Sequence, residues 1–467
     1  MTQTVQLPLW LFILIMLFAA VTALSHFLLP SVRWFFRRRL ERAVTQINKR
    51  LTRPIEPFKL ARRYDMIQRL IYDPEVSREI AAYAKTEGIP ENVAFQKAKS
   101  YAREIVPSFS AFAYFGFGIG VSKALARSVY SIKTSDQNEP TFNAIPADAT
   151  VIFVMNHRSN MDYLLVTYLA ARTSALSYAV GEWARVWPLS LLIRSMGAYF
   201  IRRKSRGALY RKVLARYVQL ATAGGVNQAI FPEGGLSLTG VLQPPKLGLL
   251  SYVVDGFDPE AERDVVFVPV AINYDRVLED RVLIAAHKRG DRRFGARISV
   301  VVGFILRKLW GRLRGADTRF GSAAVAFGEP LSLRAVQGMK VDALSLDLMR
   351  RIEVAMPVLG VPLIATALLE KGPLSAVDLE AEVAKLITRV PAKNLALQKD
   401  AVPEDVASAC QHMELHGTIE KQDGRWAIQV GQESVAQFYA NSIAHFLSDA
   451  APGGAAGAKE ISAPAGS

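Results

Sequence analysis

The stretch VIFVMNHRSNMDYLLVTYLA, from Val151 to Ala170, decides the fold that we expect. It begins as an apolar run, which is typical of a buried strand, and it ends with the spacing of an amphipathic helix. His157 and Asp162 lie in the polar break between the two. In α/β domains the ligand site lies beyond the carboxyl ends of the strands, so this break is the first place to look for chemistry.

The spacing of His157 and Asp162 allows them to act as a pair. Asn160 is a good N-cap residue for the helix, which places Asp162 in its first turn. If His157 leans back over that turn, Asp162 can accept the Nδ1 proton and leave Nε2 free to take a proton from a hydroxyl. This is the base and orienting half of a catalytic triad. A capping aspartate next to an unrelated turn histidine fits the same residues.

Alternating strands and helices indicate an α/β domain over residues 148–335 with a largely parallel sheet. Helical patterns such as RGALYRKVLARYVQLATAGG separate several of its short β-branched runs. These runs are TVIFVM, LSYAV, AYFI, QAIFP, VVFVPVAI, RISVVVG and AVAFG.

The flanks of this domain read differently. Residues 31–147 have helical spacing, interrupted at Gly88 and Pro90, and they end in the polar, turn-rich KTSDQNEPTFNAIPADA. Residues 336–450 are mostly helical with a hairpin-like TIEKQDGRWAIQV, and residues 451–467 have the low complexity of a disordered tail.

Residues 1–30 predict one transmembrane anchor. Leu7 to Leu29 is almost entirely apolar and long enough for a span of ~20 residues. A cleaved signal peptide usually opens with positive charge, and MTQTVQ has none. The basic cluster RWFFRRRLER follows directly and should stay on the cytoplasmic side. We therefore expect a single-pass protein of the cell membrane with its catalytic domain on the cytoplasmic face.

The net charge of +15 favours an anionic partner such as a phospholipid surface, a phosphorylated substrate or nucleic acid. Nucleic acid is disfavoured, because residues 363–450, which read as helices followed by a hairpin, hold 7 Lys and Arg against 12 Asp and Glu. The single Cys410 cannot form an intrachain disulfide. Neither CxxC nor a His-rich cluster is present, so we expect no metal site.

Three further segments carry polar or unusual residues at strand ends. GAYFIRRKS ends a strand with Arg202 and Arg203, whose planar guanidinium groups suit phosphate, although a solvated basic turn has the same composition. AIFPEGGLSLTG carries Glu233 in a Gly-rich turn that is either a ligand loop or a tight capped turn. VFVPVAINYD places Pro269 inside an apolar run, which predicts a sheet edge or strand end near the site.

Together, NHRSNMD, GAYFIRR, FPEGG and VFVPV resemble, in order and spacing, four motifs of the glycerolipid acyltransferase superfamily. The segments YAREIVPSFSAFAYFGFGIGVSKAL, GALYRKVLARYVQLA and FYANSIAHFL are similar to the large membrane-bound glycerol-3-phosphate acyltransferases. The resemblance implies an acyltransferase-type α/β core that passes a fatty acyl group from a thioester to a hydroxyl of glycerol 3-phosphate.

The resemblance also implies residue roles. His157 would be the general base and Asp162 its orienting partner. Arg202 and Arg203 would contact the phosphate, Glu233 and Gly234 would position the glycerol, and Pro269 would shape the acyl-donor side. The family commonly has arginines where this chain has Leu236 and Leu238, so Arg203, Lys204 or Lys246 would replace them, or the acceptor differs.

Two alternatives remain open from the sequence. The first is acylation of lysophosphatidate, which the leucines in GGLSLTG keep in view. The second is a non-catalytic membrane scaffold, which would leave the four motifs unexplained. No cofactor is implied, because the co-substrate would be an acyl thioester of coenzyme A or of acyl carrier protein.

Overall fold

A computed structural model describes residues 8–17, 42, 44–135, 144–170, 175–181, 185, 187, 189–202, 207–261, 263–290, 320–397 and 402–448. The chain divides into two compact units, Met1–Ile55 and Glu56–Ser467. In the first unit residues 9–17 are helical. Among the described residues we find no helix with the length and apolar character needed to cross a membrane. Most of Leu7–Leu29 lies outside those residues, so the transmembrane helix stays a prediction.

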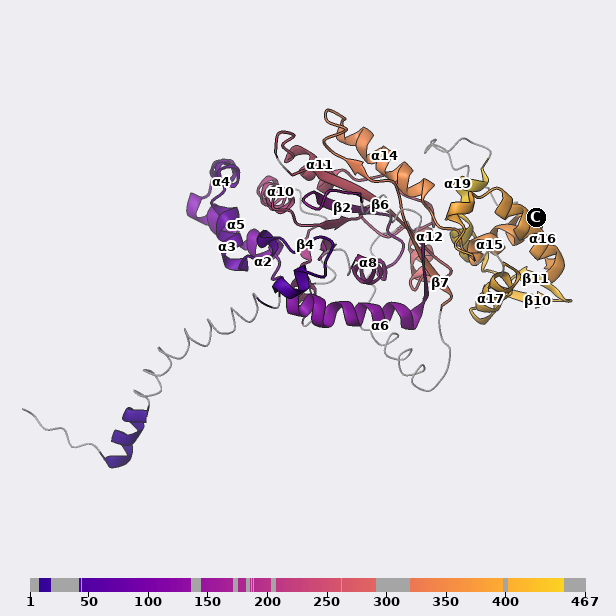
Figure 1. The fold of residues 1–467 in the computed structure, drawn as a ribbon, viewed down its shortest axis with the longest axis horizontal. Coiled ribbons are helices and arrows are strands. Elements are labelled where there is room, and N and C mark those ends of the chain that lie inside the picture. Colours follow the sequence, from indigo (N-terminus) through magenta and orange to yellow (C-terminus); the bar gives the residue numbers. More distant parts are fainter. Residues whose placement is uncertain are drawn as a thin grey trace, which may run out of the picture. The chain divides into compact units, whose positions relative to one another are not determined.

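The second unit is built on an eight-stranded sheet in the order β1-β7-β6-β2-β5-β3-β4, with β8 beside β6 (Figure 1). The strands from β6 to β4 in this order are all parallel. β7 and β8 pair antiparallel with β6, and β1 pairs parallel with β7. The predicted α/β fold with a mostly parallel sheet is therefore confirmed. The strands are β1 Ser131–Ser135, β2 Thr150–Met155, β3 Ser177–Gly181, β4 Tyr199–Ile201, β5 Gln228–Ile230, β6 Val265–Tyr274, β7 Ser322–Phe327 and β8 Leu331–Ser332.

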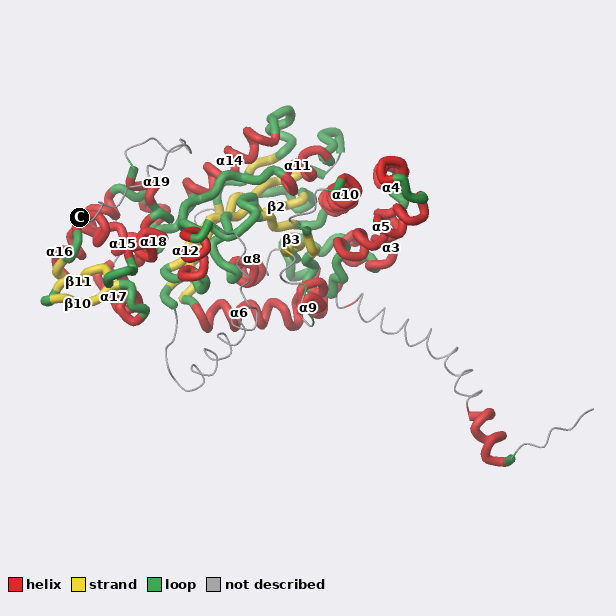
Figure 2. The backbone as a smooth tube through the Cα atoms, turned by 180° about the vertical axis from the view of Figure 1, so that it is seen from behind, coloured by secondary structure: helices red, strands yellow, loops and turns green. Residues whose placement is uncertain are grey.

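Both faces of the sheet are covered, which explains why its central strands are continuous apolar runs. Every residue of β2 and β6 is buried. In Figures 1 and 2, α10 Ala208–Ala223, α11 Gly248–Asp255 and α14 Val341–Val354 lie on one side, and α6 Ile119–Val129 and α8 Asp162–Ala170 lie on the other. Two apolar cores result, one on each face.

Before the α/β domain, the described residues from 44 to 129 are mostly helical. Gly88, at φ 63°, separates two of the helices there, where the sequence predicted an interruption. These helices are α2 Pro57–Leu60, α3 Arg63–Ile71, α4 Pro74–Glu87, α5 Glu91–Ile105, the π-helix η1 Phe112–Gly118 and α6. Strand β1 was missed, because SIKTS is short and polar. It pairs with β7 at the edge of the sheet, so only one of its two long sides has a neighbouring strand.

The C-terminal part packs as a helical layer with a small sheet. The predicted hairpin is confirmed as β10 Ile419–Gln422 and β11 Arg425–Ile428, with Asp423 and Gly424 at positive φ in the turn. Strand β9 Leu374–Ser375 completes this sheet. The remaining elements are α9 Leu189–Ser195, α12 Asp280–Lys288, α15 Gly360–Lys371, α16 Ala376–Thr388, η4 Ala392–Asn394, α17 Val402–Leu415, α18 Glu433–Ala440 and α19 Ala444–Leu447. The predicted strand RISVVVG and the tail 451–467 lie outside the described residues.

Candidate active site

The catalytic turn, which we define as residues 156–162, joins the carboxyl end of β2 to the first residue of α8. Asn156 fixes its start, since the Asn156 side chain donates to the Ile272 carbonyl at 2.9 Å and accepts from the Ile272 amide at 2.8 Å. At its end the Asp162 amide donates to the Ser159 carbonyl at 3.1 Å. The turn is thereby tied to the central strand β6 at its start and closed at its end by a hydrogen bond within the turn.

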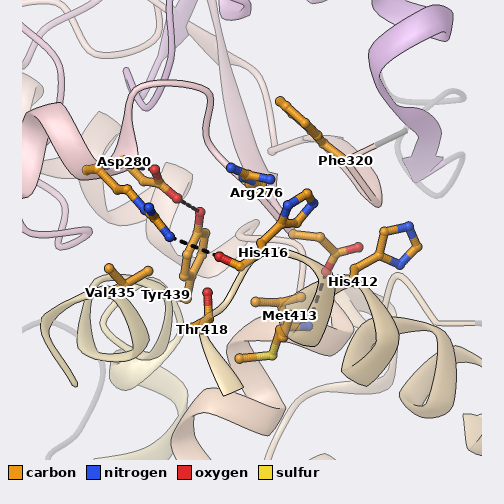
Figure 3. A pocket seen from close by; sticks show the side chains of 12 residues that line it. Arg276, Asp280, Phe320, His412, Met413, His416, Thr418, Val435 and Tyr439 are labelled. Atoms are coloured by element: carbon orange, nitrogen blue, oxygen red, sulfur yellow. Dashed lines mark hydrogen bonds between the residues drawn. The ribbon is translucent and has the colours of Figure 1, made fainter. Parts of the chain in front are cut away.

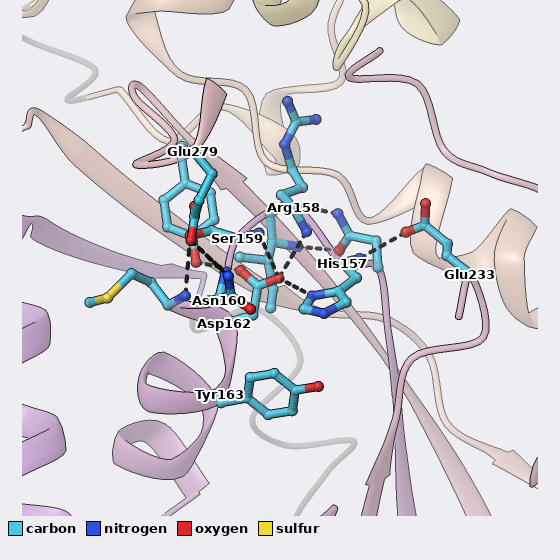
Figure 4. A network of polar contacts seen from close by, with 12 residues as sticks. His157, Arg158, Ser159, Asn160, Asp162, Tyr163, Glu233 and Glu279 are labelled. Atoms are coloured by element: carbon cyan, nitrogen blue, oxygen red, sulfur yellow. Dashed lines mark hydrogen bonds and ion pairs between the residues drawn. The ribbon is translucent and has the colours of Figure 1, made fainter. Parts of the chain in front are cut away.

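His157 and Asp162 form the expected pair. The distance from His157 Nδ1 to Asp162 Oδ2 is 2.9 Å, and the two residues are 2% and 0% exposed. The same oxygen accepts the backbone amides of Arg158 at 2.8 Å and Ser159 at 3.1 Å (Figure 4). With its acceptor oxygen fixed by two backbone groups, Asp162 can set both the tautomer and the tilt of the imidazole.

Tyr274, at the end of β6, is a site residue that the sequence reasoning missed. Its hydroxyl donates to Asp162 Oδ1 over 2.5 Å. Complete burial raises the pKa of Tyr274, with the Asp162 charge adding to the effect, so the phenol keeps the proton that it donates. Both carboxylate oxygens of Asp162 are therefore occupied.

Aromatic rings hold the imidazole of His157. Phe231 lies 4.1 Å from it between ring centroids, and Tyr163 lies edge-on at 5.5 Å. Nε2 makes no hydrogen bond to any residue in the part of the chain that the structure describes. The imidazole is thus anchored through Nδ1, and Nε2, the nitrogen suited to accept a proton, is unbonded within the described part of the chain.

Glu233 does not reach toward an open site. One carboxylate oxygen accepts the His157 amide at 2.8 Å, and the other accepts the Gln243 amide at 3.0 Å. Burial raises the pKa of Glu233 to about 7, although these two hydrogen bonds oppose the shift. The structure places Glu233 as a support for the backbone of the catalytic histidine rather than as a visible ligand for glycerol.

Glu279, just before α12, is a second carboxylate that the sequence reasoning missed. It accepts from the Ser159 hydroxyl at 2.8 Å and from the side-chain and backbone nitrogens of Asn160 at 3.0 and 3.3 Å. Asn160 is therefore not the helix cap that the sequence indicated, because α8 begins at Asp162 and the Asn160 amide is engaged by Glu279. The only signal for Glu279 is its place shortly after the VFVPV motif.

Gly234 and Lys246 lie beside each other in the loops after β5. Gly234 has a φ of 65°, and a Cβ there would lie 2.7 Å from Lys246 Cδ and 3.2 Å from its Nζ. Since Phe231, three residues earlier, packs on the His157 ring, this exposed lysine brings positive charge to the loop nearest the histidine.

Arg202 lies farther away. Its strand, β4, is three strands from β2 in the sheet, about 14 Å at the usual spacing. Its Nε and Nη2 bond both oxygens of Glu104 at 2.6–3.1 Å, while Arg185 Nη1 lies 2.9 Å from the same carboxylate. Burial would raise the pKa of Glu104, but the two arginines outweigh it and hold that pKa below its ordinary value. Arg203 and Lys204 lie outside the described residues.

Pro269 is neither at a sheet edge nor at a strand end, which corrects the expectation from sequence. It lies in the middle of the central strand β6, between the residues that pair with β8 and those that pair with β7. A missing N–H is tolerated there because β6 changes partners at that point, while the Pro269 carbonyl still accepts the Gly328 amide at 2.8 Å. A Cβ on Gly328 would lie 3.0 Å from the Pro269 ring.

Leu236 and Leu238, at the positions where arginines were anticipated, are half-buried and pack against the apolar core. They add no charge to the loop after β5. Among the described residues no three His, Cys, Asp or Glu side chains gather as a metal site.

Comparison with known proteins bears on the family resemblance. Residues 138–273 match the family model Acyltransferase, and residues 306–452 match the model Glycerol-3-phosphate acyltransferase C-terminal region. The resemblance to glycerolipid acyltransferases is confirmed: the chain carries an acyltransferase domain. Its second matched region is, more particularly, that of the glycerol-3-phosphate acyltransferases.

Individual relatives have low sequence identity to this chain but align with more than half of it. A glycerol-3-phosphate acyltransferase of Xylella fastidiosa is 26% identical over 444 residues, which cover 89% of this chain and 50% of that protein. One of Aeromonas hydrophila is 32% identical over 278 residues, 59% of this chain and 33% of that protein. An acyltransferase of Mycobacterium tuberculosis is 29% identical, covering 86% of this chain and 64% of that protein. The chain spans about half the length of the first of these relatives.

The crystal structure of a 1-acyl-sn-glycerophosphate acyltransferase from Thermotoga maritima aligns with 62% of this chain and 94% of its own, at 17% identity. The TM-score is 0.32, which is too low to support a shared fold.

Proposed function

We propose that this protein transfers a fatty acyl group from a thioester to a hydroxyl of glycerol 3-phosphate, making lysophosphatidate, with His157 as the general base. The observation that carries the proposal is the buried His157–Asp162 pair, in which Nδ1 is fixed at 2.9 Å and Nε2 has no partner in the described chain. The family and the relatives support the choice of reaction and acceptor.

The site residues account for the first step. A glycerol hydroxyl gives its proton to His157 Nε2 as its oxygen attacks the thioester carbonyl, while Asp162 stabilises the charge that forms on the imidazole. The tetrahedral intermediate then collapses, the carbon–sulfur bond breaks, and the imidazolium returns the proton to the departing thiolate. The products are the ester and a free thiol, so no further reactant is needed. Positioned general-base catalysis of this kind contributes ~10²–10⁴-fold.

Lys246 is our first choice for the phosphate of the acceptor, because its ammonium lies beside Gly234 near the histidine. Arg202 is the second. Its side chain is 35% exposed, and its pairing with Glu104 could exchange for a phosphate. Arg203, Gly234 and Pro269 keep, as proposals, the roles that the family resemblance implies. For Glu233 we propose support of the His157 backbone beside the positioning of glycerol that the resemblance implies.

We also propose that Leu7–Leu29 anchors the protein in the cell membrane with the acyltransferase domain at the cytoplasmic phospholipid surface. The apolar length of this segment and the basic cluster after it support the proposal. The acyl donor is a thioester of coenzyme A or of acyl carrier protein.

Release of free coenzyme A from palmitoyl-CoA by the detergent-solubilised protein tests the function. Glycerol 3-phosphate, lysophosphatidate and no acceptor are compared, with His157→Ala alongside and the exposed His287→Ala as the matched control. Turnover with glycerol 3-phosphate that is lost only in His157→Ala is the expected result. Turnover with lysophosphatidate alone would show that the second acylation is the reaction, a reading favoured by Leu236 and Leu238. Absence of turnover with every acceptor, and also with an acyl carrier protein thioester as donor, would leave the non-catalytic membrane scaffold as the interpretation.

A further inference from the structure

Helix α18 of the C-terminal region touches the catalytic turn through a buried arginine. Arg158, next to the proposed base, is 2% exposed, and its Nη1 donates to the Gly240 carbonyl at 3.0 Å. Its guanidinium lies 5.3 Å from the centroid of the Phe438 ring, on α18. In Figure 4 the Arg158 side chain points away from the His157 ring, so it does not face the position of a reacting atom.

The serine loop, residues 237–241, lies between the catalytic turn and α18. The Ser237 amide donates to the His157 carbonyl at 2.9 Å, and the Ser237 hydroxyl closes the loop by accepting from the Gly240 amide at 3.0 Å. A Cβ on Gly240 would lie 1.9 Å from the Phe438 carbonyl oxygen, so only glycine allows this approach. The Asn441 side chain donates to the Thr239 carbonyl at 2.8 Å.

A second route joins α18 to the same turn. The Tyr439 hydroxyl donates to Asp280 at 2.6 Å (Figure 3). It also accepts the Val277 amide at 3.0 Å. Asp280 follows Glu279 directly, and Glu279 holds Ser159 and Asn160. The C-terminal region is therefore connected to the catalytic turn by two routes, one through Arg158 and one through Asp280 and Glu279.

Stability alone does not explain an arginine at this position. Arg158 Nε and Nη2 are buried and have no hydrogen-bond partner among the residues that the structure describes. A buried guanidinium with two unpaired donor nitrogens is costly, and an apolar side chain of similar volume would fill the same space at lower cost. What an apolar residue cannot supply is the bond to Gly240 and the contact with the Phe438 ring.

We propose that Arg158 is a positioning residue, through which α18 holds the catalytic turn in the geometry that His157 needs. The expected effect on kcat rests on the proposed function, whereas the expected effect on the rigidity of the catalytic turn does not. It assigns the C-terminal region a part in catalysis: the region fixes the backbone amides of Arg158 and Ser159 that donate to Asp162.

The test compares Arg158→Ala and Phe438→Leu with Leu379→Ala in the full-length protein. Phe438→Leu keeps an apolar side chain and removes the aromatic face. Leu379 is a buried residue of α16 that belongs to the same core but not to the serine loop or the turn, so its truncation destabilises the region in a matched way. Thermal midpoints, kcat and KM are measured for each, and amide hydrogen exchange is followed in the peptide that contains Arg158 and Ser159.

We expect kcat to fall on the order of 10²-fold in Arg158→Ala with little change in KM, a smaller fall in Phe438→Leu, and an unchanged kcat in Leu379→Ala. Exchange in the catalytic turn should rise in the first two variants only. Ethylguanidinium added to Arg158→Ala should restore part of kcat and should do nothing for Leu379→Ala.

Equal kcat and equal exchange in Arg158→Ala and Leu379→Ala would overturn the inference, as would a failure of Arg158→Ala to loosen the turn. If the wild-type protein transfers no acyl group, the proposed function fails, and the exchange comparison still decides whether α18 holds the turn through Arg158.

Discussion

The catalytic turn and the end of β4 each carry a motif of the same family, yet they are built in opposite ways. In the turn, Asp162 is fully buried and both its oxygens are bonded by groups of the protein. At the end of β4, the Arg202 side chain is 35% exposed and pairs with a carboxylate that Arg185 also contacts. One region is fixed before any substrate arrives, and the other can exchange a partner.

This difference separates two kinds of kinetic effect. Groups held by buried hydrogen bonds act on the geometry of the base and should change kcat. Half-exposed charges act on ground-state binding and should change KM, in a way that salt weakens. Variants of the two regions therefore sharpen the comparison or break it.

Replacing the base should have the largest effect. His157→Ala should remove the whole general-base contribution, a fall of ~10²–10⁴-fold in kcat, with KM for glycerol 3-phosphate little changed. Steady-state thiol release measures it, with His287→Ala as control. Retention of more than a tenth of the wild-type kcat would remove His157 from the chemistry.

Asp162→Asn should lower kcat by most of the factor that we expect for His157→Ala. An amide offers one oxygen where the carboxylate accepts from Nδ1, two backbone amides and the Tyr274 hydroxyl. The imidazole loses the acceptor that sets its tautomer. The kcat of the variant, compared with that of His157→Ala, checks this. A variant with wild-type kcat would show that the pair is structural.

Glu233→Gln should reduce kcat roughly tenfold to hundredfold. One of the two backbone amides that Glu233 accepts, at His157 or at Gln243, then faces an NH₂ group and loses its bond, at ~1–3 kcal/mol. An unchanged kcat would mean that the backbone support of His157 is redundant.

The pH dependence of stability gives Glu233 a second test. Burial raises its pKa from 4.5 to about 7, so the folded protein favours the neutral carboxyl. The stabilising contribution is fully present below about pH 4.5 and is lost as the pH rises through about 7, on the order of 3 kcal/mol in all. Thermal midpoints at pH 5 and 7.5 should therefore differ less in Glu233→Gln than in the wild type. Equal differences would place the titration in another group.

Tyr274→Phe should lower kcat less than Asp162→Asn does. It removes one donor to Asp162 Oδ1 and leaves the three bonds to Oδ2 in place. A hydrogen bond to a charged group contributes ~1.5–3 kcal/mol, so kcat should fall by roughly tenfold or somewhat more. If Tyr274→Phe lowered kcat as much as Asp162→Asn, the orientation of the imidazole would depend on Oδ1 rather than on the backbone amides.

The sequence predicted the contact between site residues that lie close together in the chain. His157 and Asp162 lie within one strand–turn–helix unit, so their contact follows from the length of the turn. Tyr274 and Glu279 meet the same turn only because β6 pairs with β2 in a register that sets Met155 opposite Val270, which places the end of β6 beside the turn. No spacing in the chain encodes that register.

The same limit explains the error about the place of Pro269 and the contacts of Glu233 that the sequence did not show. A proline in an apolar run predicts an edge, and only the change of partner from β8 to β7 shows why a central strand tolerates it. A glutamate in a Gly-rich turn predicts a ligand, and only the three-dimensional approach of the His157 amide shows that the carboxylate is already occupied.

The smallest predicted effects are changes in KM caused by variants at the end of β4. Whether KM rises or falls is more informative there than the size of the change. If Arg202 binds the acceptor phosphate, it must give up Glu104. Arg202→Ala should then raise KM for glycerol 3-phosphate a few-fold, and Glu104→Gln should lower it, because the arginine is released from its ion pair. Both effects should shrink as salt increases, and kcat should stay constant. If both variants instead raise KM, the ion pair supports the fold around β4 and the phosphate lies elsewhere. Lys246→Ala would then be expected to show the larger change in KM, because Lys246 Nζ lies beside Gly234 in the loop that packs on the histidine.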